Sequence, residues 1–518
     1  MHEAYLNQVH SVLPRILSLY DTDSSSDTYG MGDRYHWAWG LIDFGNGTYQ
    51  GAAHGLARLL THDLLPQEFD NKKILNRIDA MFRATKKLCR KDGSMEEAFP
   101  YEGSFCVTAL VAYDLISAVD LLEGQLNKDV KNQYLAIIRP IISYLFHADE
   151  THAVISNHLA TAVAALYKWQ KVTGEAAEIR GYELLQRILR HQSKEGWFKE
   201  YEGADPGYQT LCTYYLADVH RMKPELGLLE PLKKSIEFLW YFAHPDGSFG
   251  GIYGSRNTRF YYPAGIEWLS HEVPEAASLA VHMRNAINDN NVVSLSVMDE
   301  PNLIPMFNAY CWAATCTEEM SKLPVIPCKS NKNYRKYYDE AGLFVDRGID
   351  YYTIVSTNKG GVVYHFVNNN LDTINTGVML KARSGRLYST QAFQPENKVK
   401  IAKDIIEIYA GFQPVTRRTP TPLQFLILRA MNVTIMRTKW LREKVKQMLV
   451  KLLITRKTKP RTYNTRKIHL GRKLKLKDKV DNKSDYEILE NATQFVSIHM
   501  ASQGYWQIQD DIKHDPTL

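Results

Sequence analysis

The 518-residue sequence predicts a multidomain chain of the α+β class, in which a helical part precedes a block of antiparallel strands. Three observations predict this fold class. A loop motif recurs along the chain, apolar residues follow helix-type spacing from residue 50 to about 325, and strand-type segments follow residue 335. We expect a helical domain over residues 1–328 and an antiparallel β-sandwich over residues 335–518.

The recurring motif is a glycine-centred loop at residues 91–97, 194–203 and 245–249. Its glycines, Gly93, Gly196 and Gly247, are 103 and then 51 residues apart. A step of about 50 residues accommodates one pair of antiparallel helices with their loops, and the longer step accommodates two pairs. The motif therefore predicts stacked helix pairs, with equivalent helices starting at the same end of the stack.

Apolar spacing and capping residues predict the individual helices. Apolar residues recur every three or four positions at residues 50–60, 74–88, 104–122 and 157–173. The last of these helices has Ser156 or Asn157 as its expected N-cap, and Gly174 follows its end. Asp205 and Pro206 open the next helix as N-cap and first-turn proline, and this helix runs toward residue 220.

Segments rich in β-branched and aromatic residues predict the strands. Residues 351–356 and 361–366 are the clearest, and the turn at residues 358–360 predicts a hairpin between them. Further strands are expected at residues 376–381, 386–390, 405–412, 466–470, 473–477, 495–500 and 504–509.

A basic amphipathic helical insertion at about residues 420–460 interrupts the strands. Residues 417–479 contain 20 Lys and Arg but only two acids, Glu443 and Asp478, a formal charge of +18 in a chain whose total is +6. The remainder of the chain carries −12 and is mildly acidic. The insertion is typical of a helix that binds an anionic membrane surface. A bound polyanion is another interpretation, and an insertion packed on the sandwich with a solvated basic face is a third.

Several classes of protein and site are not indicated. The sequence shows no secretory signal and no apolar stretch long enough to span a membrane, so we expect a cytoplasmic protein, peripheral on the inner membrane if the insertion binds lipid. The six scattered cysteines include no CxxC pair, which predicts free thiols and no metal site. No nucleotide-binding motif is present, we expect no cofactor, and nucleic acid binding would depend on the basic segment alone.

The residues that could carry chemistry lie at two predicted helix starts. Asn157 and His158 begin one helix, and Tyr208 lies in the first turn of the helix that Asp205 caps. Helix N-termini favour anions and disfavour imidazolium, so we expect His158 to be neutral and able to accept a proton. These residue types suit β-elimination in a uronate polymer, where a base removes the C5 proton and an acid protonates the departing O4. Alone, Asn157 would be read as a helix cap, His158 as a surface histidine and Tyr208 as a tyrosine at the edge of a groove.

The chain resembles the heparinase II/III-like proteins. Asn157-His158 is similar to the Asn-His pair of that family, and Tyr208 to its catalytic tyrosine. The resemblance also covers residues 29–37, 100–105, 203–208 and 253–258, which are most like a bacterial branch that we associate with surface-polysaccharide (capsule or O-antigen) gene clusters. It implies an incomplete α/α toroid with a glycan cleft, followed by an antiparallel β-sandwich, and a lyase in which Tyr208 and His158 transfer protons and Asn157 neutralises the substrate carboxylate.

Other residues could contact substrate or complete the chemistry. Arg34 and Arg256 could hold a carboxylate or phosphate, although a structural salt bridge is an equal interpretation, and Trp37 could stack on a sugar ring. Glu102 and Asn257 lie in the segments that carry the resemblance. The family's second base is a histidine or tyrosine beyond the toroid, for which His365 and His244 are the candidates here.

Three functions follow from these observations. The first is a polysaccharide lyase. The second is a non-catalytic accessory glycan-binding protein of surface-polysaccharide biosynthesis at the inner membrane. The third is an inverting glycoside hydrolase, in which two carboxylates of the repeated loops act as acid and base. The carboxylate candidates are Glu97, Glu102, Glu200, Glu202 and Asp205, of which Asp205 is also the expected helix cap.

Overall fold

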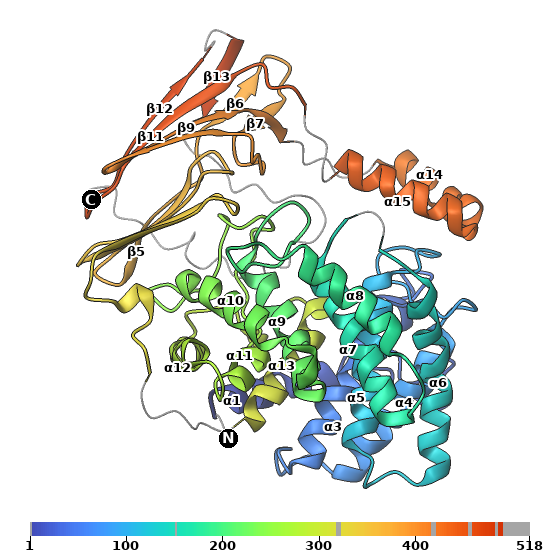
Figure 1. The fold of residues 1–518 in the computed structure, drawn as a ribbon. Coiled ribbons are helices and arrows are strands. Elements are labelled where there is room, and N and C mark those ends of the chain that lie inside the picture. Colours follow the sequence, from blue (N-terminus) through green and yellow to red (C-terminus); the bar gives the residue numbers. More distant parts are fainter. Residues whose placement is uncertain are drawn as a thin grey trace.

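The computed structural model describes residues 3–150, 153–316, 323–415, 421–453, 458–481 and 485–489. It shows an α/α toroid followed by antiparallel sheets, as the sequence predicts (Figure 1). The strands expected at residues 495–500 and 504–509 lie outside the described residues. Across the described ranges, no helix has both the length and the apolar character needed to cross a membrane.

The toroid consists of inner helices surrounded by outer ones. The inner helices are α3 (Ala52–Thr61), α5 (Phe105–Leu121), α7 (Ser156–Thr173), α9 (Pro206–Met222), α11 (Ala264–Leu269) and α13 (Glu300–Thr315). The outer helices are α1 (Glu3–Leu17), α4 (Asn71–Leu88), α6 (Lys128–His147), α8 (Glu178–Arg190), α10 (Leu229–Leu239) and α12 (Pro274–Asn288), and the short α2 (Arg34–Trp37) follows α1. Helices α5, α7, α9 and α13 are buried nearly all round, whereas α4, α8 and α10 bury only one apolar face, as expected for an outer ring. Helix α13 packs against both α1 and α3, so the first and last parts of the ring are in contact.

The recurring loops are structurally equivalent, as the motif predicts. Gly93, Gly196 and Gly247 all have positive φ angles, of 87°, 98° and 91°. Each loop follows an outer helix and leads toward an inner one, and each of the three glycines faces the next outer helix, α6, α10 or α12. The loops therefore mark the end of the toroid at which the inner helices begin.

The strands form three sheets. The first is β1-β2-β3-β4-β5, with β1 (Tyr334–Tyr338), β2 (Leu343–Arg347), β3 (Tyr351–Ser356), β4 (Val362–Val367) and β5 (Asn370–Asn375). The second is β12-β11-β9-β8, with β8 (Lys398–Ala402), β9 (Ile405–Gly411), β11 (Tyr463–His469) and β12 (Lys475–Val480). The third is β10-β7-β6-β13, with β6 (Met379–Ala382), β7 (Leu387–Ser389), β10 (Gln413–Val415) and β13 (Tyr486–Leu489).

The central strands of the first sheet, β2, β3 and β4, are buried on both faces. Tyr352, Ile354 and Tyr364 belong to the core of the toroid, whereas Val355 and Val363 pack with residues of β9 and β11 to form the core of the sandwich. Neighbouring residues on a strand point to opposite faces. The continuous apolar runs of β3 and β4 thus join the toroid and the sandwich.

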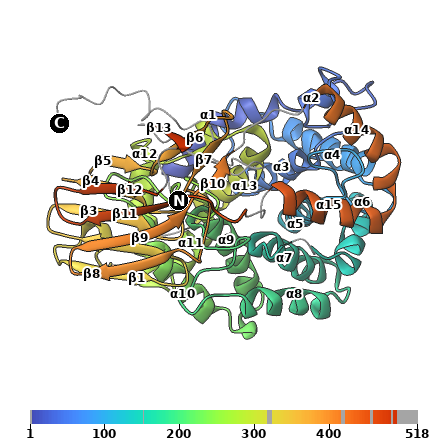
Figure 2. The same ribbon diagram turned by 90° about the horizontal axis from the view of Figure 1, so that it is seen from above.

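Two helices lie between β10 and β11, in the segment expected to be a basic insertion. They are α14 (Pro422–Val433) and α15 (Lys439–Leu453), and they lie on the same side of the toroid as the sheets (Figures 1 and 2). Arg442, which is buried, pairs with Asp92 at 3.5 Å and approaches Gly103, so α15 contacts the first recurring loop. Since Phe393 of the sandwich packs against Gly203, the insertion and the sandwich both cover the end of the toroid where the inner helices begin.

Candidate functional site

The start of α7 is tied to the second recurring loop. Its N-cap is Ile155, which makes no side-chain capping bond, so the expected capping by Ser156 or Asn157 is wrong. The Ser156 hydroxyl instead donates to the Lys199 carbonyl at 2.7 Å, and the Asn157 amide donates to Glu200 Oε2 at 2.8 Å. These two side chains are bound by the carbonyl and the carboxylate of the loop, and neither caps the helix backbone. The Asn157 amide is therefore placed beside a carboxyl group, where it can take part in chemistry.

His158 lies next to Glu150, and its protonation differs from the sequence prediction. Its Nδ1 is 2.8 Å from Glu150 Oε1. Burial alone would lower the pKa of His158, but the neighbouring Cys106 and Glu150 raise it well above its ordinary value. Burial raises the pKa of the Cys106 thiol to about 11, so the thiol is neutral at pH 7 and Glu150 is the charge that stabilises the imidazolium. The expectation of a neutral His158 is wrong because a carboxylate at hydrogen-bond distance outweighs the partial charge of a helix end.

Glu200 is a buried carboxyl group that titrates near neutral pH. Its exposure is 4%, and burial raises its pKa to about 7, although Arg256, His158 and the Asn157 amide oppose the rise. A carboxyl group with such a pKa can be present in both its protonated and its ionised form at neutral pH. From the sequence Glu200 was only one of five candidate carboxylates, and its place in the recurring loop was the available signal.

Tyr208 and Arg256 form the other half of this cluster. Tyr208 lies in the first turn of α9, and its ring packs edge-on against Phe260 with a centroid distance of 5.2 Å. The Arg256 guanidinium lies over the ring of Tyr201 at 4.3 Å and over that of Tyr208 at 5.5 Å. Such a cation stabilises negative charge that develops on the neighbouring phenol oxygen. We call Asn157, His158, Glu200, Tyr208 and Arg256 the proton-transfer cluster.

Asp205 holds the backbone of this cluster in place. It caps α9, as the sequence predicts, by accepting from the Tyr208 backbone N–H at 3.2 Å. The same carboxylate accepts from the Arg256 backbone N–H at 2.9 Å and from the Thr258 hydroxyl. Asp205 is thus a buried helix cap that also fixes the Arg256 segment. These contacts agree with the structural role that the sequence offers for Asp205 as a helix cap.

The sandwich supplies Lys359 to the Arg256 segment. Lys359 lies in the turn between β3 and β4, at the position of the predicted hairpin, and its Nζ donates to the Asn257 side chain and to the Gly254 carbonyl, the latter at 3.0 Å. Burial lowers the pKa of Lys359 to about 7. Asn257 has a φ of 62° and is buried, so its side chain serves this contact between the two halves. The sequence predicted the hairpin, but no sequence signal pointed to this role of Lys359.

The remaining candidate residues lie outside the cluster. Arg34 donates to the Ser18 carbonyl at 3.1 Å and lies over Trp37, whose indole donates to the Leu19 carbonyl at 2.8 Å, so both are bound at the end of α1. Glu102 accepts from the Ala98 backbone at 2.8 Å within the first recurring loop.

The two candidate histidines for the second base are both engaged elsewhere. His365 lies on β4 facing the sandwich core, with Nδ1 2.8 Å from the Thr353 hydroxyl and Nε2 3.1 Å from the Arg472 carbonyl. His244 bonds to Ser248 at 2.7 Å and to the Tyr253 hydroxyl at 2.8 Å, and burial lowers its pKa to about 3. Neither residue is among the contacts of the proton-transfer cluster described above.

The raised pKa of Glu200 predicts a pH-dependent stability. The group binds its proton more tightly when folded, so its contribution is fully present below pH 4.5 and is lost as pH rises through about 7. Relative to Glu200→Gln, the wild-type free energy of unfolding should fall by about 3 kcal/mol over this interval. Urea unfolding of both proteins at a series of pH values measures the difference. A difference that does not change with pH would show that Glu200 titrates normally.

Comparisons with known proteins show similarity at the level of fold. No family model matches the sequence, and no curated protein matches it. The structure resembles chondroitin AC lyase from Streptomyces coelicolor A3 with a TM-score of 0.51 and 10% identity, over 79% of this chain and 63% of that lyase. Heparinase III gives a TM-score of 0.45 and 12% identity over 77% and 75% of the two chains. Cellobiose 2-epimerase from Bacillus thermoamylovorans B4167 gives a TM-score of 0.43 and 10% identity, over 60% of this chain and 99% of that enzyme. At these identities the likeness to the chondroitin lyase shows the fold alone.

Proposed function

We propose that the protein is a polysaccharide lyase that cleaves a uronate-containing chain by β-elimination. The observation that carries the proposal is the proton-transfer cluster, which combines an amide, an imidazolium, a near-neutral carboxyl, a phenol and a guanidinium at the starts of two adjacent inner helices. Helix N-termini favour the anionic groups of a uronate. The fold shared with chondroitin AC lyase supports a polysaccharide substrate.

In the proposed reaction Tyr208 acts as the base and His158 as the acid. Protonated Glu200 and the Asn157 amide, which has two N–H donors of which Glu200 accepts one, neutralise the uronate carboxylate and make the C5 proton acidic. The phenolate of Tyr208, stabilised by Arg256, removes that proton. The electron pair forms the C4–C5 double bond and the bond to O4 breaks, while His158 gives its proton to O4. No water enters the products.

A panel of acidic and neutral glycans tests this proposal. The lyase should produce new reducing ends together with the ultraviolet absorbance of an unsaturated uronate. New reducing ends without absorbance would favour the inverting hydrolase, in which Glu200, with its raised pKa, would be the acid. If the panel includes bacterial capsule and O-antigen and neither signal appears, the non-catalytic accessory function is favoured instead.

We also infer that α14 and α15 bind an anionic lipid surface. The arginines of this insertion turn toward the toroid, because Arg429 pairs with Asp43 at 2.7 Å and Arg437 reaches the Tyr101 hydroxyl at 3.2 Å. These contacts place the arginines against the toroid and favour an orientation in which other faces of the two helices meet a lipid surface. Its apolar side chains are left exposed at Leu423, Phe425, Leu426, Ile427, Trp440 and Met448.

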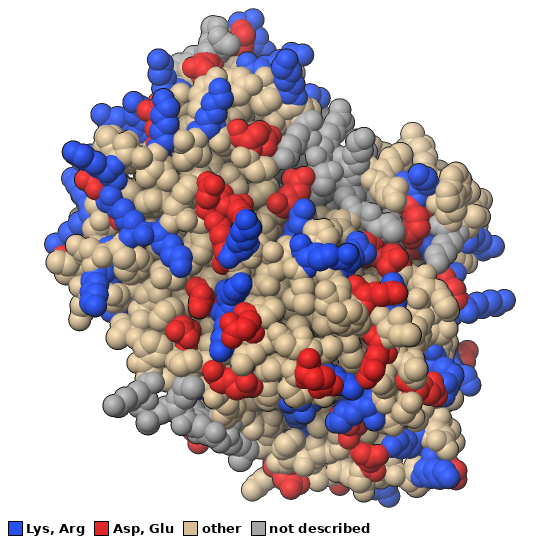
Figure 3. All heavy atoms as spheres, in the orientation of Figure 1, with Lys and Arg blue, Asp and Glu red and all other residues tan. Residues whose placement is uncertain are grey.

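Charge complementarity indicates the kind of lipid. Residues 417–479 carry a formal charge of +18, and Figure 3 shows Lys and Arg gathered over the strand region, on the same side of the toroid as the insertion. Exposed apolar side chains in a helix of strongly basic composition are typical of a helix that lies in the headgroup layer of an anionic bilayer. Binding of this kind would keep the protein peripheral on the membrane.

Co-sedimentation with vesicles of phosphatidylglycerol and phosphatidylcholine tests this inference. The protein should bind at low salt, and Leu426→Glu should weaken binding about tenfold, because it places a charge where a side chain enters the bilayer. Ile179→Glu is the matched control, since Ile179 is 81% exposed on the outer helix α8, away from the insertion. Equal effects of the two substitutions, or no binding at low salt, would contradict the inference.

A further inference from the structure

A cavity lies at the other end of the toroid, where the inner helices finish. Its volume is about 560 Å³. Every inner helix contributes residues from its last turns or from just beyond its end: Arg58, Thr61 and His62 from α3, Ser117, Asp120 and Leu121 from α5, Lys168 and Lys171 from α7, Arg221 from α9, Trp268 and His271 from α11, and Trp312, Thr315 and Cys316 from α13. The volume is within the range of about 300–1,000 Å³ that is typical of ligand sites. The proton-transfer cluster lies at the opposite ends of α7 and α9, so the cavity is a separate site.

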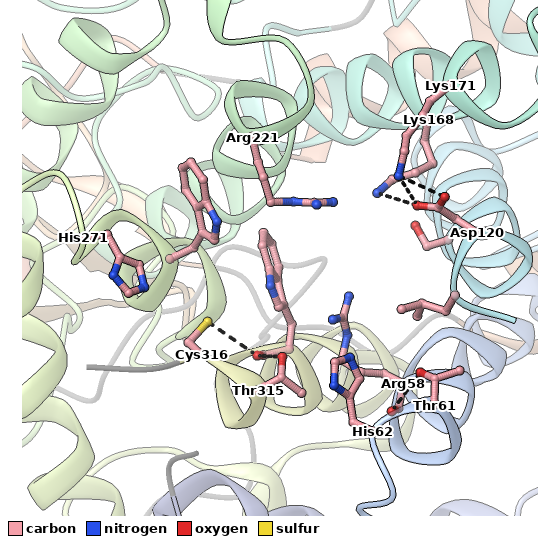
Figure 4. Close-up of a pocket in the computed structure, with 14 residues that line it drawn as sticks. Arg58, Thr61, His62, Asp120, Lys168, Lys171, Arg221, His271, Thr315 and Cys316 are labelled. Atoms are coloured by element: carbon pink, nitrogen blue, oxygen red, sulfur yellow. Dashed lines mark hydrogen bonds and ion pairs between the residues drawn. The ribbon is translucent and has the colours of Figure 1, made fainter. Parts of the chain in front are cut away.

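Basic side chains dominate the charge of this cavity. Arg58, Lys168 and Arg221 reach from three helices into the same open space (Figure 4). Lys168 and Arg221 share the carboxylate of Asp218, at 2.9 Å and 2.7 Å, and Lys171 pairs with Asp120 at 2.8 Å.

Arg58 differs from the other three cations. Within the part of the chain that the structure describes, it forms no ion pair with a carboxylate and lies instead over the indole of Trp312, with its carbon 5.7 Å from the ring centre. Its Nε is buried and has no hydrogen-bond partner among the described residues. Among the described residues, the carboxylates of Asp120 and Asp218 pair with the other three cations, so the four cations together leave an excess of two positive charges.

The positive charge of the cavity also affects the pKa of a neighbouring histidine, His54. His54 is buried on α3 one turn before Arg58, and its pKa is lowered by burial and by the positive charges of Arg58 and Lys168. Basic residues in the last turn of a helix commonly offset the negative partial charge of its end. That effect explains the positions of Arg58, Lys171 and Arg221, which lie in the last turns of their helices, but not that of Lys168. It does not explain why they converge on an open cavity that also has Trp268 and Trp312 in its wall.

We propose that this cavity binds a small anionic saccharide, a sugar that carries a phosphate or a carboxylate. The guanidinium of Arg58 and the ammonium groups of Lys168 and Lys171 would bind the anion, since hydrogen bonds between ionised partners are the strongest class. The indole of Trp268 would pack against the apolar face of the sugar ring. This binding site is independent of glycan cleavage at the other end of the toroid.

Isothermal titration calorimetry of the full chain tests the proposal, with glucose 1-phosphate, glucuronate, inorganic phosphate and glucose as separate probes. At least one of the two anionic sugars should bind, more tightly than inorganic phosphate, and glucose should bind far more weakly. Stronger binding of the phosphate or of the carboxylate form identifies the anion that the site accepts. Binding of glucose as tight as that of both anionic sugars, or no binding of any probe, would overturn the proposal.

Variants link the binding to this cavity. Arg58→Gln should raise the Kd of the anionic sugar at least about tenfold, and Lys171→Gln should raise it less, because Lys171 is half-exposed and already paired. Arg83→Gln is the matched control, since Arg83 is mostly exposed on the outer helix α4. Thermal unfolding of each variant identifies loss of fold, and Lys171→Gln gives a second answer if Arg58→Gln is unstable. An unchanged Kd in both cavity variants, or an equal loss with Arg83→Gln, would overturn the assignment to this cavity.

Discussion

Replacing Tyr208 with Phe is expected to abolish formation of the unsaturated uronate product. The substitution removes only the hydroxyl, and the ring can keep its edge-on contact with Phe260 and its place beneath Arg256. A positioned proton-transfer group contributes roughly 10²–10⁴-fold to the rate, so the loss should be at least this large. Ultraviolet absorbance under saturating substrate measures it, and unchanged thermal unfolding shows that the fold is intact.

Tyr201→Phe is the matched control for this prediction. Tyr201 lies against the same guanidinium and is buried to the same extent as Tyr208, at 9% exposure, but we assign it only the support of Arg256. Its removal should cost less than about tenfold. A larger loss with Tyr201→Phe than with Tyr208→Phe would exchange the roles of the two tyrosines, and full activity of Tyr208→Phe would remove it from the mechanism.

Gly196→Ala should produce a large loss of stability. The glycine has a φ of 98°, and a Cβ at this position would collide with the carbonyl oxygen of Lys234 on α10. A shift of the α10 backbone or of the tight turn would disrupt their packing, so the free energy of unfolding should fall by about 3–5 kcal/mol.

Gly227→Ala separates the collision from the backbone conformation. Gly227 has a φ of 68° and no atom within 4 Å of the position that a Cβ would take. Gly227→Ala should therefore lower the free energy of unfolding by only about 1 kcal/mol, which is the cost of placing an alanine in the left-handed conformation. Urea unfolding of the two variants measures the difference, and equal losses would show that packing of the recurring loop on α10 contributes little.

The fold could be predicted to a large extent because its signals are local. The period of the recurring loops, the Asp205-Pro206 start of α9 and the turn that contains Lys359 are each encoded within a few residues, and the structure has all of them. The sequence does not predict six of the strands that the structure describes, namely β1, β2, β5, β8, β10 and β13. β1, β5, β8 and β13 contain charged or polar residues and are partly exposed, β10 has only three residues, and β2 ends in two charged residues, so the apolar pattern of each is weak or short.

The contacts within the site could not be predicted, because they join residues far apart in the sequence. Asn157 was interpreted as a cap since nothing local shows that Glu200 lies 2.8 Å from its amide. The protonation of His158 depends on Glu150, and the conformation of the Arg256 segment depends on Lys359 from the other half of the chain. Residue types at helix starts were enough to identify candidates, but their charge states follow from the tertiary structure.

The same limit applies to the insertion. Its basic and apolar composition is evident from the sequence, but which face is exposed depends on partners such as Asp43 and Asp92 in the toroid. Arg429 and Arg442 contact these acids, and apolar residues of the same helices such as Leu426 and Trp440 are exposed.

Mass spectrometry of the products formed from a uronate-containing polysaccharide in heavy-oxygen water tests the central claim most directly. Elimination breaks the bond to O4 without adding water, so the account predicts an unsaturated product that contains no heavy oxygen from the solvent. A product that gains one heavy oxygen atom at the cleaved bond would contradict it, because that result requires hydrolysis.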